Sequence, residues 1–234
     1  IYVSSYYDRR VRKIRVSDGA CLGSIVPGQT YAYPRSIDIH NGHLYASTNR
    51  GLFTLNISNG ASKICPGTNR NEWRYSYTIT GSGSYLYSHY NRRIYRGTLT
   101  NSGSNLCPTS VKNYYDGTMS YGYGMTAHPT NPNELYFISM GANSIFKFTV
   151  NSNGTGRTIN WQKGRYGYQK QSTATQNYFY RARSIHYDDD NDRLIVSGYS
   201  AKKIQVFDSN GVFIKDKGGV AATTRMAAAH AAIK

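Results

Sequence analysis

A short pattern, [IL]-Y-x-S, recurs along the chain and constrains its fold more than any other feature. The copies and their variants are IYVS at residue 1, LYAS at 44, LYSH at 86, LYFIS at 135 and LIVS at 194. Each copy is followed by a loop, a second β-like segment and a turn rich in Ser, Asn, Asp and Gly. Four of them are preceded by another β-like segment, namely RSIDIH, YSYTIT, YGMTAH and RSIHYD. Four short strands in roughly 40–50 residues indicate one blade of a β-propeller.

Five copies predict an all-β fold, a five-bladed β-propeller of four-stranded antiparallel blades that forms a single domain over residues 1–234. The predicted blade cores lie near residues 1–34, 35–74, 75–124, 125–182 and 183–234. Six blades are the alternative, if the stretch 157–182 contains a degenerate blade. Because that stretch lacks a second [IL]-Y-x-S pattern, an elongated loop is favoured.

The first blade begins at its second strand, so its innermost strand has to come from elsewhere. The C-terminal segment TTRMAAAHAAIK lies one blade length after the last pattern, and its Arg225 aligns with Arg35, Arg74 and Arg183, each just before an inner strand. We therefore predict that this segment closes the ring and removes an open sheet edge. Its alanine content favours a helix instead.

The segment KKIQVFDSNGVFIKDKG (202–218) resembles the NHL-type propeller repeat, with a short I-x-V strand, a D/S turn and a short outer strand. HPTNPNELYF (128–137) is similar to the first hairpin of the related YVTN-type repeats. The resemblance holds at repeat level over nearly the whole chain. It implies the propeller fold, and these families include binding modules, scaffolds and some enzymes, so it does not fix the function.

Charge and tyrosine content point to the class of ligand. The chain carries 28 Lys and Arg against 12 Asp and Glu, a formal net charge of +16, and it contains 23 tyrosines. Such a surface concentrates polyanions such as acidic or sulfated glycans and nucleic acid. Tyrosine combines a stacking face with a hydroxyl group, although part of its abundance reflects β propensity. No apolar run is long enough to span a membrane.

In a propeller, the loops that lead into the inner strands share one face with the turns between the second and third strands. Most arginines and many tyrosines of this chain fall in those loops, whereas acidic and small residues collect in the opposite turns. The predicted ligand-binding residues are Arg35, Arg74, Arg183, Arg225, Tyr31, Tyr33, Trp73, Tyr90, Tyr121 and Tyr123. Guanidinium groups bind carboxylate, sulfate or phosphate, and aromatic rings stack on sugars or bases. The alternative is that the repeated arginines bond neighbouring blades and hold the ring together.

No metal or cofactor site is predicted. The run Asp188–Asp192 resembles a calcium loop only in its spacing, and a solvated turn explains it better because the glycine and distal glutamate of an EF-hand are absent. The histidines His40, His128, His186 and His230 do not share one repeat position, which argues against a ring of metal ligands.

The three cysteines cannot all pair within one chain. Cys65 and Cys107 occupy equivalent outer positions of neighbouring repeats, which we expect to lie beyond disulfide reach. Free thiols or one pair across two repeats remain the alternatives, with Cys21 left over in the second case.

The leading interpretation is a secreted, non-enzymatic, lectin-like propeller whose basic, tyrosine-rich face binds carbohydrate, favouring acidic or sulfated glycans. The first alternative is binding of nucleic acid or another polyanion by charge, or a protein-interaction scaffold. The second is a polysaccharide hydrolase or lyase, which needs paired carboxylates. The residues available for such a pair are Asp38, Glu72 and Asp116, and nothing in their spacing marks them.

Overall fold

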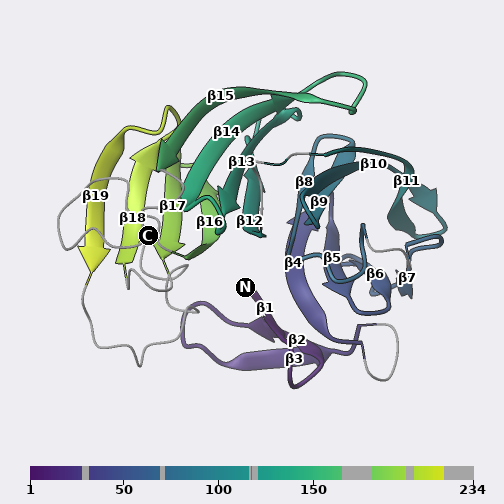
Figure 1. The fold of residues 1–234 in the computed structure, drawn as a ribbon. Coiled ribbons are helices and arrows are strands. Elements are labelled where there is room, and N and C mark those ends of the chain that lie inside the picture. The colour runs from purple at the N-terminus through teal and green to yellow at the C-terminus, as the bar shows by residue number, and fades with distance from the viewer. Residues whose placement is uncertain are drawn as a thin grey trace. The chain divides into compact units, whose positions relative to one another are not determined.

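Each of the five predicted repeats folds into its own antiparallel sheet, with strands that follow one another in chain order (Figure 1). The computed structural model describes residues 1–27, 32–68, 72–115, 117, 121–164, 181–198 and 203–218. These residues contain strands, turns and bends and no α-helix, and hence no helix long and apolar enough to cross a membrane. The predicted fold class is confirmed: the chain is an all-β, five-bladed β-propeller.

The first sheet has three described strands, and the other four sheets have four each. The first sheet consists of β1 (Tyr2–Ser5), β2 (Arg10–Ile14) and β3 (Cys21–Ile25). The second consists of β4 (Pro34–His40), β5 (His43–Thr48), β6 (Gly51–Asn56) and β7 (Ser62–Ile64). The third consists of β8 (Thr78–Ser82), β9 (Tyr85–Tyr90), β10 (Arg93–Ser102) and β11 (Asn105–Tyr115).

The last two sheets continue the same order. The fourth consists of β12 (Gly122–Ala127), β13 (Glu134–Ser139), β14 (Ser144–Val150) and β15 (Arg157–Gly164). The fifth consists of β16 (Ala182–Asp188), β17 (Arg193–Gly198), β18 (Lys203–Asp208) and β19 (Phe213–Gly218). The C-terminal strand predicted to complete the first blade lies outside the described residues, as do residues 165–180 of the stretch 157–182. The prediction of an elongated loop is wrong for the first part of that stretch, which forms the outer strand β15.

The chain forms two compact units, which are described separately below. Unit 1 comprises Ile1–Tyr90 and Ile94–Lys112 and holds the first three sheets apart from a few residues of the third. Unit 2 comprises Asn91–Arg93 and Asn113–Lys234 and holds the fourth and fifth sheets.

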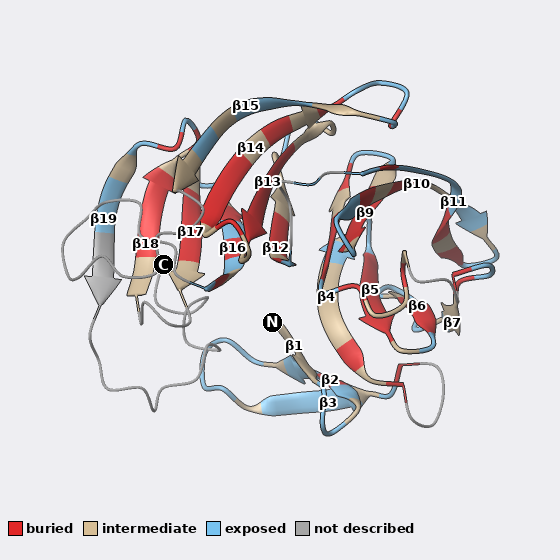
Figure 2. Cartoon of the chain, in the orientation of Figure 1, coloured by how far each residue is buried: buried red, intermediate tan, exposed pale blue. Residues whose placement is uncertain are grey.

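The hydrophobic core lies in layers between neighbouring sheets of each unit. The middle strands of the four-stranded sheets are largely buried, whereas β3 is almost fully exposed (Figure 2). On β5, Leu44 and Ala46 pack in the cluster with Val11 of the first sheet, and Tyr45 packs on the other side with Leu86 of the third. The alternation of a strand therefore explains the repeated pattern, because its leucine and tyrosine fill two different layers.

Two buried serines, Ser47 of β5 and Ser88 of β9, fix the loop that leads into the third sheet. The buried hydroxyl of Ser47 lies 2.9 Å from the carbonyl oxygen of Trp73 and 3.0 Å from that of Ser76. In the third sheet, the Ser88 hydroxyl bonds the carbonyl oxygen of Glu72 in the same loop. The position of residues 72–76 is thus set by buried hydrogen bonds from two sheets.

A disulfide joins Cys65 to Cys107, with their Cα atoms 5.5 Å apart. The expectation that these two positions lie out of reach is therefore wrong, and the alternative of one pair across two repeats is correct. Both side chains point into the layer between the second and third sheets, where Trp73 packs against them in the same cluster. Equivalent outer residues can meet because neighbouring sheets pack face to face. Cys21 is exposed on β3 and forms no disulfide among the described residues.

Side chains of β4 hydrogen-bond directly to the backbone of β8, which lies beside it. The contacts are Ile79 N–H to Ser36 Oγ (3.0 Å), Gly81 N–H to Asp38 Oδ2 (2.6 Å) and His40 Nε2 to Gly83 O (2.7 Å). These three β4 residues alternate along the strand, so all of them face β8. Asp38 and His40 thus have structural partners in the seam between the second and third sheets.

Burial raises the pKa of Asp38 from 3.8 to about 7, although hydrogen bonds from the N–H groups of Gly81 and Ile39 act in the opposite direction. A raised carboxyl pKa means that the folded state binds the proton more tightly than the unfolded state. We therefore expect the free energy of unfolding to fall by about 1–2 kcal/mol between pH 5 and pH 7, and to change little through this group above pH 7.

Replacing Asp38→Asn removes the titrating group and keeps an oxygen acceptor for Gly81. Urea unfolding at pH 5, 6, 7 and 8 should show a smaller decline for the variant than for the parent protein. Identical slopes in the two proteins would contradict the assignment to Asp38.

Candidate functional site: the tyrosine and arginine residues before the first strands

Strand register identifies which residues of the four-stranded sheets are equivalent. The third residue after the leucine of each pattern pairs with a residue near the start of the first strand. Those paired residues are Ser36, Thr78, Gly124 and Ser184. The residues just before them are Arg35, Tyr77, Tyr123 and Arg183.

In each of these four sheets, the residue two positions closer to the N-terminus is also a tyrosine or an arginine. These residues are Tyr33, Tyr75, Tyr121 and Arg181. The four tripeptides therefore read Tyr-Pro-Arg, Tyr-Ser-Tyr, Tyr-Gly-Tyr and Arg-Ala-Arg. We call the two outer residues of each tripeptide a lead-in pair. The end of a sheet at which its lead-in pair lies is its lead-in end.

This alignment corrects a predicted equivalence. Arg74 was matched with Arg35 and Arg183, but the equivalent residue of the third sheet is Tyr77. In the fourth sheet the register places Tyr123 at this position. The leucine of the pattern follows the second residue of the pair by 9 residues in the second and third sheets, by 12 in the fourth and by 11 in the fifth. Strand register was therefore needed to identify the lead-in pairs.

The backbone of the lead-in pairs departs from a regular strand. The register shifts between Pro34 and Ser36, between Gly122 and Gly124, and between Ala182 and Ser184, so Arg35, Tyr123 and Arg183 each lie at a β-bulge. Bulges turn a side chain away from its regular direction and are frequent beside functional sites.

The first residue of three lead-in pairs has a left-handed backbone. The φ angles are 65° at Tyr75, 52° at Tyr121 and 51° at Arg181. Residues other than glycine rarely adopt this conformation, which costs free energy and persists where the surroundings enforce it. Three equivalent residues share it, so it is a property of the repeat.

In unit 1, aromatic rings surround the guanidinium group of Arg35. Its Cζ atom lies 5.5 Å from the ring centre of Tyr6, 5.3 Å from that of Tyr75 and 5.0 Å from that of Tyr77. Tyr6 comes from the β1–β2 loop of the first sheet and the other two from the lead-in pair of the third. Cation–π attraction accounts for the grouping.

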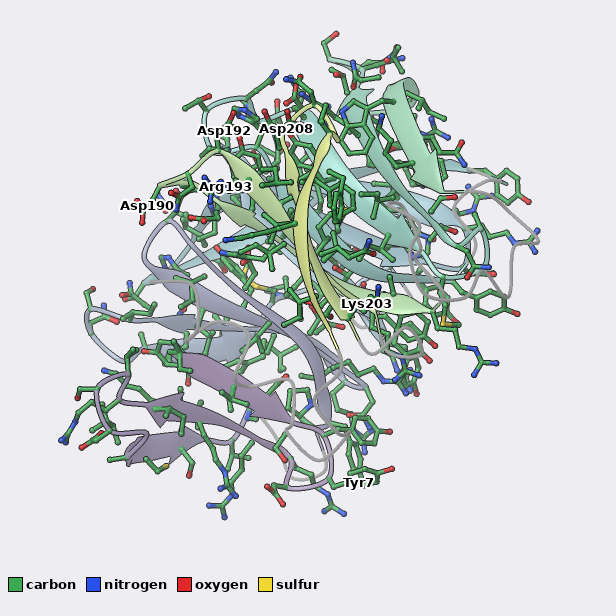
Figure 3. The ribbon with its side chains drawn as sticks, turned by 90° about the vertical axis from the view of Figure 1, so that its left-hand side faces the viewer. Tyr7, Asp190, Asp192, Arg193, Lys203 and Asp208 are labelled. Carbon is green, nitrogen blue, oxygen red and sulfur yellow. A yellow bond between two sulfur atoms is a disulfide. The ribbon has the colours of Figure 1, made fainter. Side chains whose placement is uncertain are left out.

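Further residues extend this group at the surface. The ring of Tyr33 lies 5.0 Å from that of Tyr6, and Arg9 lies over it at 4.9 Å. Tyr7 is 90% exposed and contacts Tyr6 edge to face. Figure 3 shows Tyr7 at the edge of the molecule. We call Tyr6, Tyr33, Arg35, Tyr75 and Tyr77, with Arg9 and Tyr7 at its edge, the lead-in cluster of unit 1.

The turn between β5 and β6 holds the loops of this cluster together. Asn49 Oδ1 accepts a hydrogen bond from Tyr33 N–H (2.8 Å), and its carbonyl oxygen accepts one from Arg74 Nε (2.7 Å). Arg74 also donates to the hydroxyl of Tyr75 (2.7 Å) and lies over its ring. Arg74, predicted to bind ligand, therefore has a structural role that positions Tyr75.

Arg35 has no acidic partner among the described residues. Its Nε–H group is buried and donates to no hydrogen-bond acceptor in the described part of the chain. A buried guanidinium donor without an acceptor is costly, and an anionic group can satisfy it. The nearby Asp8 pairs with Arg12 instead, at 2.9 Å.

The remaining predicted residues are distributed unevenly. Trp73 is 1% exposed and packs in the core, so its ring is not available to stack on a ligand. Tyr90 ends β9 and is partly exposed. Tyr121, Tyr123 and Arg183 lie in unit 2, where Arg183 Cζ is 5.3 Å from the ring centre of Tyr123. Tyr31, Arg225 and the possible catalytic residue Asp116 lie outside the described residues.

The aspartate run lies at the opposite end of the fifth sheet from its lead-in pair. Asp190 and Asp192 are near Arg193 and Asp208 in Figure 3. Asp188 accepts a hydrogen bond from the side chain of Asn191 (2.9 Å), and Asp192 accepts bonds from the hydroxyls of Tyr187 and Ser209. Bonds of this kind close a turn. In the described part of the chain no group of three His, Cys, Asp or Glu residues is placed to hold a metal ion.

Comparison with known proteins supports the fold. No protein-family model and no curated protein matches the chain. Among solved structures it is similar to apo AztD from Citrobacter koseri, with a TM-score of 0.50 and 15% sequence identity. The match covers 93% of this chain and 59% of AztD, so the chain spans well under two thirds of that protein. At this identity the likeness shows the β-propeller fold alone, and the resemblance to NHL-type repeats stays a prediction.

Proposed function

We propose that this chain is a non-enzymatic, lectin-like propeller that binds acidic or sulfated glycans at the lead-in cluster of unit 1. One observation carries the proposal: Arg35 lies among three tyrosine rings and has no acidic partner in the described part of the chain. The charge of Arg35 would pair with a sulfate or carboxylate group of the ligand. Such hydrogen bonds are among the strongest in proteins, and the planar guanidinium can form two in parallel.

The rings would supply the contact with the sugar itself. Tyr6 is 39% exposed, Tyr7 90% and Tyr77 43%. Exposed tyrosine rings offer flat apolar faces for the C–H groups of a sugar and hydroxyls for its oxygens. The net charge of +16 would draw anionic ligands to the surface and repel basic ones.

The seam contacts of Asp38 favour a structural role for it over a catalytic one. Glycoside hydrolysis generally uses two carboxyl groups about 5–10 Å apart. The described neighbours of the Asp38 carboxylate are the backbone N–H groups of Gly81 and Ile39 and the buried Tyr45. Secretion is part of the proposal and is supported by the Cys65–Cys107 disulfide, since such bonds persist in oxidising compartments.

The experiment is a calorimetric titration with heparin-derived hexasaccharide at about 0.15 M salt. Replacing Arg35→Ala should weaken binding at the unit 1 site about 30-fold, because charge-assisted hydrogen bonds contribute about 1.5–3 kcal/mol. Tyr77→Ala should weaken it about tenfold.

Arg15→Ala is the matched control, because it removes the same charge from the opposite end of the first sheet, where Arg15 pairs with Asp18. It should leave the affinity within about twofold. Equal losses in the two arginine variants, with duplex DNA displacing the hexasaccharide as well as heparin does, would favour binding by net charge and overturn the lectin proposal.

A further inference from the structure

We propose that unit 2 carries a second, separate binding site for an anionic group, formed by the lead-in pairs of the fourth and fifth sheets. Its residues are Tyr121, Tyr123, Arg181 and Arg183. The class of ligand, a sulfated or carboxylated sugar, rests on the proposed function. The site itself rests on contacts within unit 2.

The strands that carry the two pairs approach closely at Gly124. A Cβ atom on this residue would lie 3.0 Å from the backbone nitrogen of Ile185 and 3.2 Å from the carbonyl oxygen of Arg183. Only glycine leaves room for β12 and β16 to meet in this way. The approach brings the bulged residues Tyr123 and Arg183 together, with the guanidinium 5.3 Å from the ring centre.

The same pairing of an arginine with a tyrosine occurs in unit 1, where the earlier of the two sheets supplies the arginine and the later one the tyrosine. There Arg35 of the second sheet lies over Tyr77 of the third, and in unit 2 Arg183 of the fifth sheet lies over Tyr123 of the fourth. In both cases the arginine and tyrosine come from equivalent positions of neighbouring sheets. The geometry of the proposed site is thus repeated in the fold.

The outer residues of the two pairs are held toward solvent. Tyr121 is 67% exposed, and its carbonyl oxygen accepts a hydrogen bond from Met140 N–H (3.1 Å). Arg181 is exposed, and its backbone N–H donates to Asn143 Oδ1 (3.4 Å). Both have left-handed φ angles, which the turn between β13 and β14 enforces through these bonds.

The charge of the fifth sheet is separated between its two ends. Two arginines, Arg181 and Arg183, lie at the start of its first strand, whereas five aspartates lie at or near the opposite end: Asp188, Asp189, Asp190, Asp192 and Asp208. Figure 3 shows three of these aspartates beside Arg193. The lead-in end is therefore the cationic end. With two arginines and two tyrosines it suits an anionic group flanked by a stacking sugar.

The test counts binding sites with the heparin-derived hexasaccharide in isothermal titration calorimetry. The parent protein should bind two molecules. Arg183→Ala should weaken one of the two sites about 30-fold and leave the other at its original affinity, and Arg35→Ala should do the converse. The double variant should show no saturable binding, and Arg183→Lys, which keeps the charge but loses the planar fork, should weaken the second site about tenfold.

Arg193→Ala is the matched control, since it removes the same charge from the opposite end of the same sheet, and it should keep both sites. If Arg183→Ala lowers the thermal midpoint, the exposed Arg181→Ala serves in its place. A single site that responds to Arg35→Ala alone overturns this inference and leaves the proposed function intact. Equal losses in the Arg183 and Arg193 variants also overturn it, and no binding by the parent protein overturns the proposed function itself.

Discussion

Replacing Cys65 and Cys107 together by alanine should lower the free energy of unfolding by about 4 kcal/mol. The disulfide closes a loop with a sequence separation of 42 residues, and the chain-entropy relation gives about 4 kcal/mol for a loop of this length. Because both side chains are buried between the second and third sheets, loss of their packing adds to the effect.

Guanidinium unfolding followed by tryptophan fluorescence measures this change. The chain has two tryptophans, Trp73 in the disulfide cluster of unit 1 and Trp161 in unit 2. In a Trp161→Phe background the signal therefore reports on the surroundings of the disulfide. Cys21→Ala is the control, since Cys21 is exposed and outside this disulfide, and it should change stability by less than about 0.5 kcal/mol. A loss below about 1 kcal/mol in the double variant would contradict a structural disulfide.

Replacing Gly81→Ala should destabilise the protein by about 3 kcal/mol. A Cβ atom on Gly81 would lie 2.1 Å from Cγ of His40 and 2.3 Å from its Cβ, distances that atoms in contact do not reach. The strands β4 and β8 would have to move apart to remove this steric overlap. Separation stretches the bond from Gly81 N–H to Asp38 and the contact of His40 with Gly83. Overpacking of this kind costs about 1–3 kcal/mol, and the weakened hydrogen bonds add to it.

A swap of the two residues tests the cause. His40→Gly alone should be destabilising, because it removes a seam hydrogen bond and adds backbone freedom. In His40→Gly with Gly81→Ala, the methyl group occupies the space that the imidazole leaves. The double variant should therefore be at least about 1 kcal/mol more stable than the sum of the single effects predicts. If the two single effects on the free energy of unfolding simply add, the contact with His40 is not what excludes a side chain at residue 81.

The residue types and the approximate location of the candidate site could be predicted from the sequence, but the equivalent residues of the different sheets could not. Its residue types and its location before the first strands followed from the repeats and the abundance of tyrosine and arginine. Arg35 and Arg183 were identified in this way. Arg74 was matched to them by residue type, but strand register gives that position to Tyr77, and the guanidinium of Arg74 bonds Asn49 and Tyr75 instead. The turn between the first and second strands differs in length among the sheets, so counting back along the sequence does not locate the equivalent position.

Local sequence determined the fold class of this protein, because each copy of the repeated pattern encodes one strand whose alternating side chains face opposite layers. Those preferences act within a few residues and can be read without knowing the partner sheet. Which side chains meet across neighbouring sheets was decided only by the tertiary structure. The Cys65–Cys107 bond, the fit of Gly81 against His40 and the rings around Arg35 all join residues from different sheets. Their distances depend on how closely two sheets pack, and that spacing is a property of the whole layer of side chains between them.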